Sequence, residues 1–103
     1  MRGGRARLRD MIQCIGDIGN YTAYGKERFD NDELVRVYVV HNLQIIGEAA
    51  YKLSANLRSQ HADVPWPKIL GLRHILVHDY FRVDYEIVWG VVELDLPRLK
   101  PQQ

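Results

Sequence analysis

Five residues with chemically useful side chains lie close together within an otherwise apolar stretch of the chain. They are Arg73, His74, His78, Asp79 and Tyr80. An imidazole titrates near neutral pH and can accept or donate a proton, and a guanidinium can hold an anionic oxygen through several N–H groups. This segment is therefore the main candidate for a site that combines proton transfer with anion binding.

The spacing of these residues restricts how they can act together. Arg73 and His78 are five positions apart, which is about 140° around an ideal helix, so they do not share a face. A site that uses both needs a distorted helix end or a second copy of the helix facing the first. His74 and His78 are four apart and do share a face, so a zinc site completed by Asp79 or by a partner chain is a separate hypothesis.

Other chemistries have no signature in this sequence. There is no glycine-rich phosphate loop, no cysteine cluster with zinc-ligand spacing and no suggestion of a Ser-His-Asp triad. Cys14 is the single cysteine, which rules out an internal disulfide, fits a reducing compartment and is interpreted as an inert, packed thiol. We therefore expect no bound cofactor or metal.

The bulk properties indicate one globular domain over residues 1–103, with 1–6 and 100–103 as flexible tails. The chain is 47% hydrophobic, so it is not a disordered polar polypeptide. Its formal net charge of +1 shows no overall basic excess, so any RNA site must come from locally placed charge. The N-terminus is charged and no apolar run is long enough to cross a bilayer. These features predict a cytoplasmic protein with no membrane contact.

Four amphipathic helices are expected around the candidate residues. The first begins at Arg7, and residues 21–28 contain its end and a loop. The second extends from a cap at Asp30 to about Arg58, with Glu33 completing a capping box and Phe29 and Leu34 forming a hydrophobic staple. The third begins at Pro65–Pro67 and ends near 78–80. The fourth is capped by Asp84, carries a Val83–Val88 staple and ends near Leu96, before Pro97. The predicted fold is an all-α, antiparallel four-helix bundle.

The second of these helices is apolar on more than one side. Apolar residues off its main stripe are Val37, Val40, Leu43 and Ile45. A helix of this kind is either central in its own bundle or buried against another subunit. Gly47, Ala49 and Ala50 would allow close approach of a second helix, so we expect a homodimer to form here.

The segment also resembles a known family. Residues 73–78 match the Arg-x4-His motif of the HEPN superfamily, and Asp79–Tyr80 completes the His-x-Tyr extension typical of HepT-like toxins. The flanking sequence is similar too, in residues 45–50, in Pro65–Trp66 and in Tyr80–Asp84. Family members usually have Asn or Asp after the motif arginine, where this chain has His74.

The resemblance implies a homodimer whose two motif segments line one cleft that cleaves RNA without a metal ion. In such an endoribonuclease toxin, Arg73 and His78 are the catalytic pair, and His74 and Asp79 line the cleft. The resemblance also implies that Tyr80 is the acceptor of AMP from a cognate MNT-type nucleotidyltransferase antitoxin. The alternative is a non-catalytic HEPN module that binds a nucleotide or docks a partner. In that case His78 would simply end the third helix, where the helix dipole favours a cation.

Overall fold

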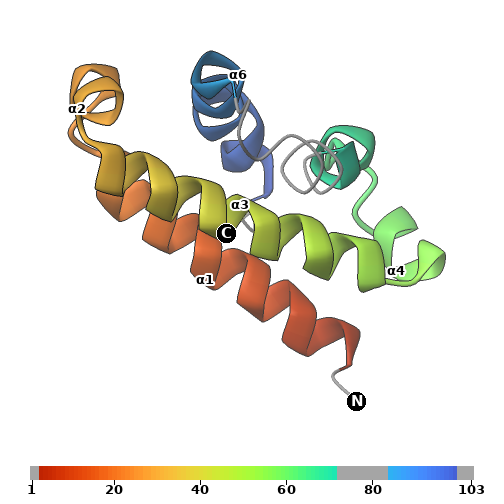
Figure 1. Ribbon diagram of the computed structural model, residues 1–103. Helices are drawn as coiled ribbons and strands as arrows, with labels where there is room; N and C mark the ends of the chain where they lie inside the picture. The colour runs from red at the N-terminus through yellow and green to blue at the C-terminus, as the bar shows by residue number, and fades with distance from the viewer. Residues whose placement is uncertain (1–2, 72–83, 100–103) are drawn as a thin grey trace.

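The computed structural model describes residues 3–71 and 84–99, and every regular element among them is helical (Figure 1). These elements include α1 (Gly4–Thr22), α2 (Lys26–Asn31), α3 (Glu33–Lys52), α4 (Ala55–Ser59), α6 (Tyr85–Gly90), η2 (Val91–Asp95) and η3 (Leu96–Leu99). The all-α prediction is confirmed for these residues. No described helix is both long enough and apolar enough to span a membrane.

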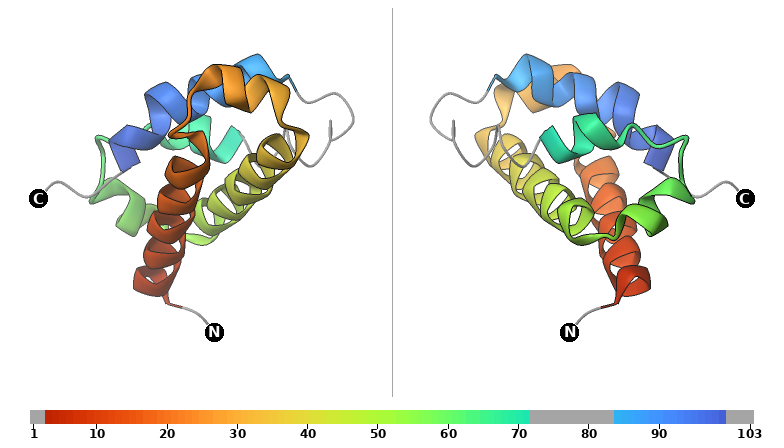
Figure 2. Two further views of the ribbon diagram at one scale, coloured as in Figure 1. Left: turned by 90° about the vertical axis from the view of Figure 1, so that its left-hand side faces the viewer. Right: turned by 90° about the vertical axis from the view of Figure 1, so that its right-hand side faces the viewer.

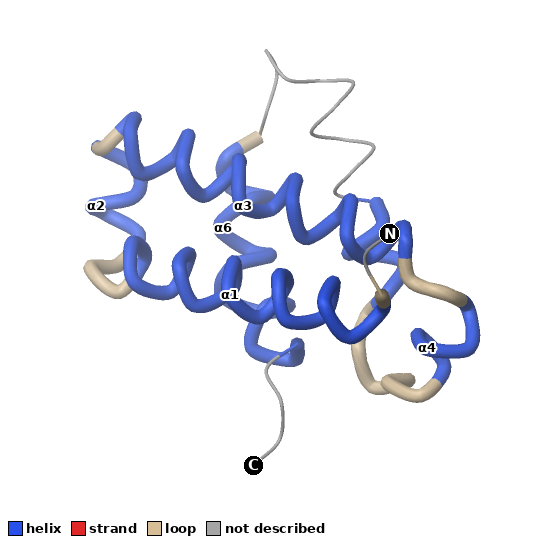
Figure 3. The backbone as a smooth tube through the Cα atoms, turned by 90° about the horizontal axis from the view of Figure 1, so that it is seen from below, coloured by secondary structure: helices blue, strands red, loops and turns tan. Residues whose placement is uncertain are grey.

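The two long helices, α1 and α3, lie side by side in opposite directions and form the centre of the described structure (Figures 1 and 3). Their facing sides bury a continuous apolar cluster that includes Met11, Ile15, Ile18, Val39, Leu43 and Ile46. This is the periodic apolar stripe expected of amphipathic helices. The first helix starts at Gly4, earlier than the predicted start at Arg7.

The loop predicted over 21–28 is wrong in its second half, because α2 begins at Lys26. Gly25, at φ +92°, provides the left-handed conformation that joins α1 to α2, which a glycine adopts without steric cost. From α2, Phe29 enters the core with none of its surface exposed and packs against the rings of Tyr85 and Trp89. Leu34 is 81% exposed, so the predicted Phe29–Leu34 staple does not form.

The N-cap of α3 is Asp32 rather than the predicted Asp30. The Asp32 carboxylate accepts a hydrogen bond from the Val35 backbone N–H at 3.2 Å and one from Arg28 Nε at 2.9 Å. The backbone bond is the larger cause, and together they lower the pKa of Asp32. Asp30 instead accepts from Lys26 Nζ at 2.7 Å.

The second long helix ends at Lys52, not near Arg58. Leu53 has extended backbone angles, and the Ser54 hydroxyl accepts from the Leu57 N–H at 3.0 Å to cap the short helix α4. A serine that bonds backbone N–H groups competes with continuation of a helix, which explains the break. The apolar periodicity continues through α4, so the sequence pattern gave no sign that the helix breaks after Lys52.

The apolar residues off the main stripe of α3 divide into two groups. Val40 and Leu43 are buried in the chain's own core, whereas Val37 and Ile45 are exposed large hydrophobic residues. The apolar surface that a second subunit would cover is therefore narrower than the sequence pattern indicated.

A further helical segment starts at residue 66 and continues to 71, the last described residue before the gap, as predicted for the third helix. The Trp66 indole N–H donates to the backbone carbonyls of Arg58 and His61, each at 3.0 Å. Ile69 is fully buried in the core. This start is fixed to the rest of the chain by both hydrogen bonding and packing, whereas the predicted end near 78–80 lies outside the described residues.

The last helical stretch is capped as predicted but is not uniform. Asp84 accepts from the N–H groups of Glu86 at 2.9 Å and Ile87 at 3.4 Å. The α-helix α6 is followed by the π-helical segment η2 and the 3₁₀ segment η3, so helical geometry passes through Pro97 rather than ending at Leu96. Figure 2 shows this stretch lying beside α2 on one side of the α1–α3 pair. Val88 is buried, but its proposed staple partner Val83 lies outside the described residues.

Cys14 lies in the core, as predicted. Burial raises the pKa of its thiol, and the nearby carboxylates of Asp17 and Asp10 raise it further. A higher pKa disfavours the reactive thiolate. The structure therefore confirms a packed and unreactive cysteine.

Candidate functional site

The five predicted site residues, Arg73, His74, His78, Asp79 and Tyr80, all lie outside the described residues. The structure describes the two helices that flank this segment in the chain. Trp66 and Ile69 anchor the helix that precedes it, and the Asp84 cap begins the helix that follows it. Both flanking helices pack on the same core, through Ile69 and Val88.

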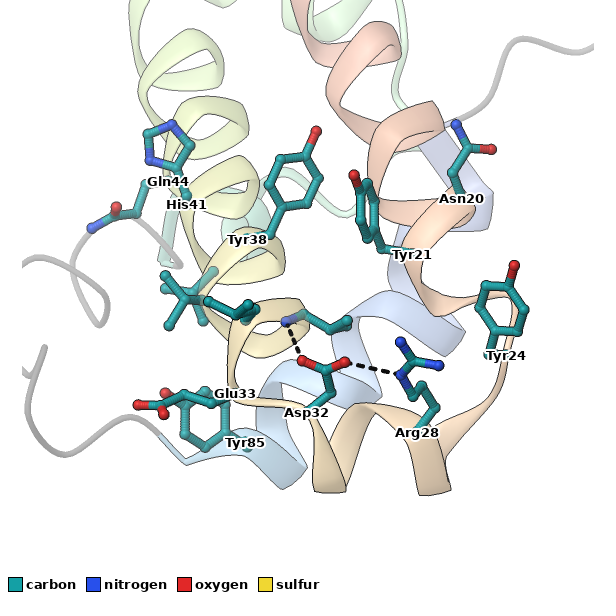
Figure 4. A pocket seen from close by; sticks show the side chains of 14 residues that line it. Asn20, Tyr21, Tyr24, Arg28, Asp32, Glu33, Tyr38, His41, Gln44 and Tyr85 are labelled. Atoms are coloured by element: carbon teal, nitrogen blue, oxygen red, sulfur yellow. Dashed lines mark hydrogen bonds and ion pairs between the residues drawn. The ribbon is translucent and has the colours of Figure 1, made fainter.

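A cavity lies along the N-terminal half of α3, beside the C-terminal end of α1. Its volume is about 1220 Å³ (Figure 4). Tyr85 forms part of its wall, and that residue follows closely after the motif segment. The cavity therefore includes the start of α6, the helix that follows the motif segment in the chain.

The wall of this cavity is rich in tyrosine. Tyr21 on α1 and Tyr38 on α3 have ring centroids 4.4 Å apart, with their planes inclined at 47°. Tyr24 is 75% exposed, and the Arg28 guanidinium lies 5.7 Å from its ring centroid. Such a contact between a cation and an aromatic face orients both side chains.

The charges around the cavity nearly cancel. Arg28 is paired with Asp32, and the depressed pKa of Asp32 keeps that carboxylate ionised at neutral pH. Glu33 is exposed on the rim, and His41 is the second basic side chain of the lining. The cavity is thus aromatic and polar rather than strongly basic.

A second, smaller cavity of about 270 Å³ continues along α3 from the first. The two share His41 and Gln44 in their walls. At its far end, the basic Arg7 and Lys52 stand with the acidic Asp10 and Glu48. The pair of cavities therefore follows one side of α3 along much of its length.

Neither cavity was foreseen from the sequence, although a signal was present. Tyr38 and His41 are three apart on α3, and residues three apart lie on one helix face, so these two side chains could have been placed together. Tyr21 lies in the last turn of α1 and Tyr24 in the turn after it. Only the antiparallel pairing of α1 and α3 brings these tyrosines to the same cavity.

No cluster of three or more His, Cys, Asp or Glu side chains positioned to hold a metal ion occurs within residues 3–71 and 84–99. The proposed zinc pair, His74 and His78, falls in the gap between these ranges. The structure therefore does not test the zinc hypothesis.

The model of the family described as "Ribonuclease HepT-like" matches residues 11–102, which include the whole motif segment. The chain belongs to the HepT-like family. This confirms the resemblance inferred from the motif and its flanks. No solved structure matches the chain at a significant level.

Several relatives are similar to this chain over nearly their full length. A protein of Caldanaerobacter subterraneus, provisionally named an RNase, is 40% identical over 99% of this chain and 92% of its own. One from Methanocaldococcus jannaschii, named in the same way, is 34% identical over 98% of this chain and 94% of its own. A protein of Thermococcus cleftensis named "Probable ribonuclease HepT" is 32% identical over 96% and 91%.

Proposed function

We propose that this chain is an endoribonuclease toxin that cleaves cytoplasmic RNA without a metal ion through Arg73 and His78. The observation that carries the proposal is the HepT-like family match, which spans the Arg-x4-His motif at 73–78. The names of the relatives, which refer to RNases, support the same activity.

The motif residues have the chemistry that RNA cleavage needs. In this reaction the 2′-oxygen of a ribose attacks the adjacent phosphorus, and the 5′-oxygen of the next nucleotide leaves. His78 can take the proton from the 2′-hydroxyl, or give one to the leaving oxygen. Arg73 can bind the phosphate and stabilise the charge that builds up on its oxygens. No step of this scheme requires a metal ion.

A homodimer would solve the spacing problem within the motif. Arg73 and His78 cannot share one face of a regular helix, but two copies of the segment facing each other supply both residues from opposite sides. In a symmetric cleft, two copies of His78 could divide the acid and base roles, with His74 and Asp79 lining the walls.

The direct test is RNA cleavage by the purified protein in the presence of EDTA, with the mass measured by light scattering on the same sample. We expect a particle of twice the 12.0 kDa chain mass and cleavage that is unchanged by the chelator. If EDTA abolishes cleavage and zinc or magnesium restores it, the metal-free mechanism is wrong. A monomer that cleaves RNA at the full rate would contradict the proposal that two subunits share the catalytic cleft.

Control of the toxin is proposed to act through Tyr80. A cognate nucleotidyltransferase antitoxin would join the Tyr80 hydroxyl oxygen to the α-phosphorus of ATP, with loss of the hydroxyl proton and release of pyrophosphate. The attached AMP carries a negative phosphodiester and an adenosine two positions from His78. The charge can pair with Arg73, and the nucleoside can fill the cleft, so RNA would be excluded without unfolding.

Tyr80→Phe is therefore expected to keep most of its cleavage activity, because no proton transfer is assigned to the hydroxyl, but to escape silencing by the antitoxin. Mass spectrometry of protein co-expressed with the transferase should locate a single AMP on Tyr80. Tyr51→Phe is the matched control, since Tyr51 is an exposed tyrosine outside the motif, and it should still be modified and silenced. An adduct on Tyr51 or Tyr85, or silencing of Tyr80→Phe through modification, would contradict the assignment.

A further inference from the structure

We propose that the cavity between α1 and α3 is a subsite that binds the bases of single-stranded RNA by stacking on Tyr21 and Tyr24. This inference rests on the proposed function, because it takes RNA as the ligand. It assigns a role to a surface made entirely of described residues, separate from the catalytic motif.

The first argument is the exposed aromatic surface. Tyr24 is 75% exposed and Tyr21 is 46% exposed. Tyr21 lies in the last turn of α1, whose other face is buried, and Tyr24 lies in the turn that follows α1. Tyr38 packs against Tyr21 at a centroid distance of 4.4 Å and so supports that ring from the α3 side. Single-stranded RNA is commonly held by stacking of unpaired bases on such rings, because every base has a flat π face.

The second argument is the set of polar groups beside these rings. Figure 4 shows Asn20, His41 and Gln44 around the same opening as Tyr21 and Tyr38. None of these three side chains has a hydrogen-bond partner within residues 3–71 and 84–99. Amides and imidazoles have both donors and acceptors, which is what the edges of unpaired bases require.

The third argument is charge. Arg28 uses its Nε to bind Asp32, and its guanidinium plane lies 5.7 Å from the Tyr24 ring centroid. Its side chain is 55% exposed and remains available to stack on a base or to contact one phosphate. With Asp32 and Glu33 nearby, the cavity is unsuited to a row of phosphates. Stacking, rather than release of counterions, should therefore supply most of the binding at this subsite.

The fourth argument is size and position. At about 1220 Å³ the cavity exceeds the usual range for a pocket that holds one small molecule, so it has room for more than one ring. Tyr85 in its wall places it at the start of α6, and His41 and Gln44 connect it to the second cavity along α3. A strand of RNA lying along this side of α3 would place bases in this cavity, and its scissile phosphate would bind outside the cavity.

The test uses a fluorescent RNA oligonucleotide with 2′-O-methyl groups, which cannot be cleaved by attack of a 2′-hydroxyl. Binding to the full-length protein is followed by fluorescence anisotropy. Tyr24→Leu and Tyr21→Leu should each weaken binding by roughly 5- to 100-fold, the usual loss when a base-stacking ring is removed. Tyr24→Phe should bind like the wild type, because the ring is retained. Tyr51→Leu, at an exposed tyrosine outside both cavities, should have no effect.

The salt dependence gives a second readout. Loss of a stacking ring releases no counterions, so the slope of log affinity against log salt should be the same in Tyr24→Leu as in the wild type. Thermal unfolding of Tyr24→Leu should be unchanged, since that ring is 75% exposed.

Two results would overturn the inference. One is unaltered affinity of Tyr24→Leu and Tyr21→Leu for the oligonucleotide. The other is a change in particle mass on light scattering with no change in affinity, which would make this face a contact between two copies of the chain. Because the oligonucleotide cannot be cleaved, failure of the proposed ribonuclease activity is recorded separately. A protein that cleaves no RNA but binds in a Tyr24-dependent manner would lose the proposed function and keep the subsite.

Discussion

Replacing His78 with alanine is expected to reduce RNA cleavage by roughly 10²–10⁴-fold, the usual effect of removing a general acid or base. The physical reason is that the imidazole is the group of the motif that can exchange a proton near neutral pH. Initial rates on a fluorescent RNA substrate measure the loss, and circular dichroism checks that the variant is folded.

The matched control is His61→Ala, which removes an exposed histidine of the turn between α4 and residue 66, outside both cavities. It should cleave like the wild type. Arg73→Ala should lose about 10²–10³-fold, as expected when one donor to a developing negative charge is deleted. If His78→Ala retained its rate, or if His61→Ala lost as much, proton transfer by His78 would be excluded.

Phe29→Ala is expected to lower the free energy of unfolding by about 3–5 kcal/mol, the range for deleting a fully buried phenyl ring. Phe29 has none of its surface exposed, and it joins α2 to α6 through its contacts with Tyr85 and Trp89 at centroid distances of 6.2 and 5.1 Å. Its loss would leave a void between these helices. Urea unfolding followed by circular dichroism measures the change.

Leu34→Ala serves as the control for Phe29. Leu34 is 81% exposed, so its truncation should change the free energy of unfolding by no more than about 0.5 kcal/mol. Equal losses in the two variants would mean that both side chains are buried together. That outcome would favour the hydrophobic staple that the sequence pattern predicts and would contradict the observed packing.

The helical class and the long amphipathic segments could be predicted from sequence, because apolar spacing depends on only a few turns of chain. The caps were harder. Asp30 and Asp32 both precede the apolar run of α3, and both are good N-cap residues. Which of them caps the helix depends on α2, within which Asp30 forms an ion pair with Lys26. The N-cap of α3 is thus determined by the neighbouring helix α2, which the sequence pattern did not reveal.

The predicted end of α3 was wrong for a related reason. Leu53 and Leu57 continue the apolar period of α3 into α4, so the spacing alone favoured one helix as far as Arg58. The interruption comes from the Ser54 side chain, which bonds to the Leu57 N–H and starts a new helix. Serine is common inside helices as well as at their starts. Whether Ser54 continues a helix or caps a new one therefore depends on where the following residues pack.

The candidate site was predictable in one respect and not in another. The motif at 73–78 is continuous in sequence, so its resemblance to the family could be recognised from residue order alone, and the family match confirms it. The tyrosine cavity combines Tyr21 and Tyr24 with Tyr38 and Tyr85, from three helices. Its existence depends on how α1, α3 and α6 pack, which local spacing does not specify.

The positions of the two tryptophans make intrinsic fluorescence a useful probe of this protein. Trp66 lies at the start of the helix leading into the motif, and Trp89 lies in the helix leading away from it, both half-buried against the same core. An indole's emission changes with the water around it, so the chain carries an intrinsic fluorophore on each flank of residues 73–80. Trp66→Phe and Trp89→Phe would leave one fluorophore each and allow the two flanks to be observed separately, without a label, when RNA or a modifying enzyme is added.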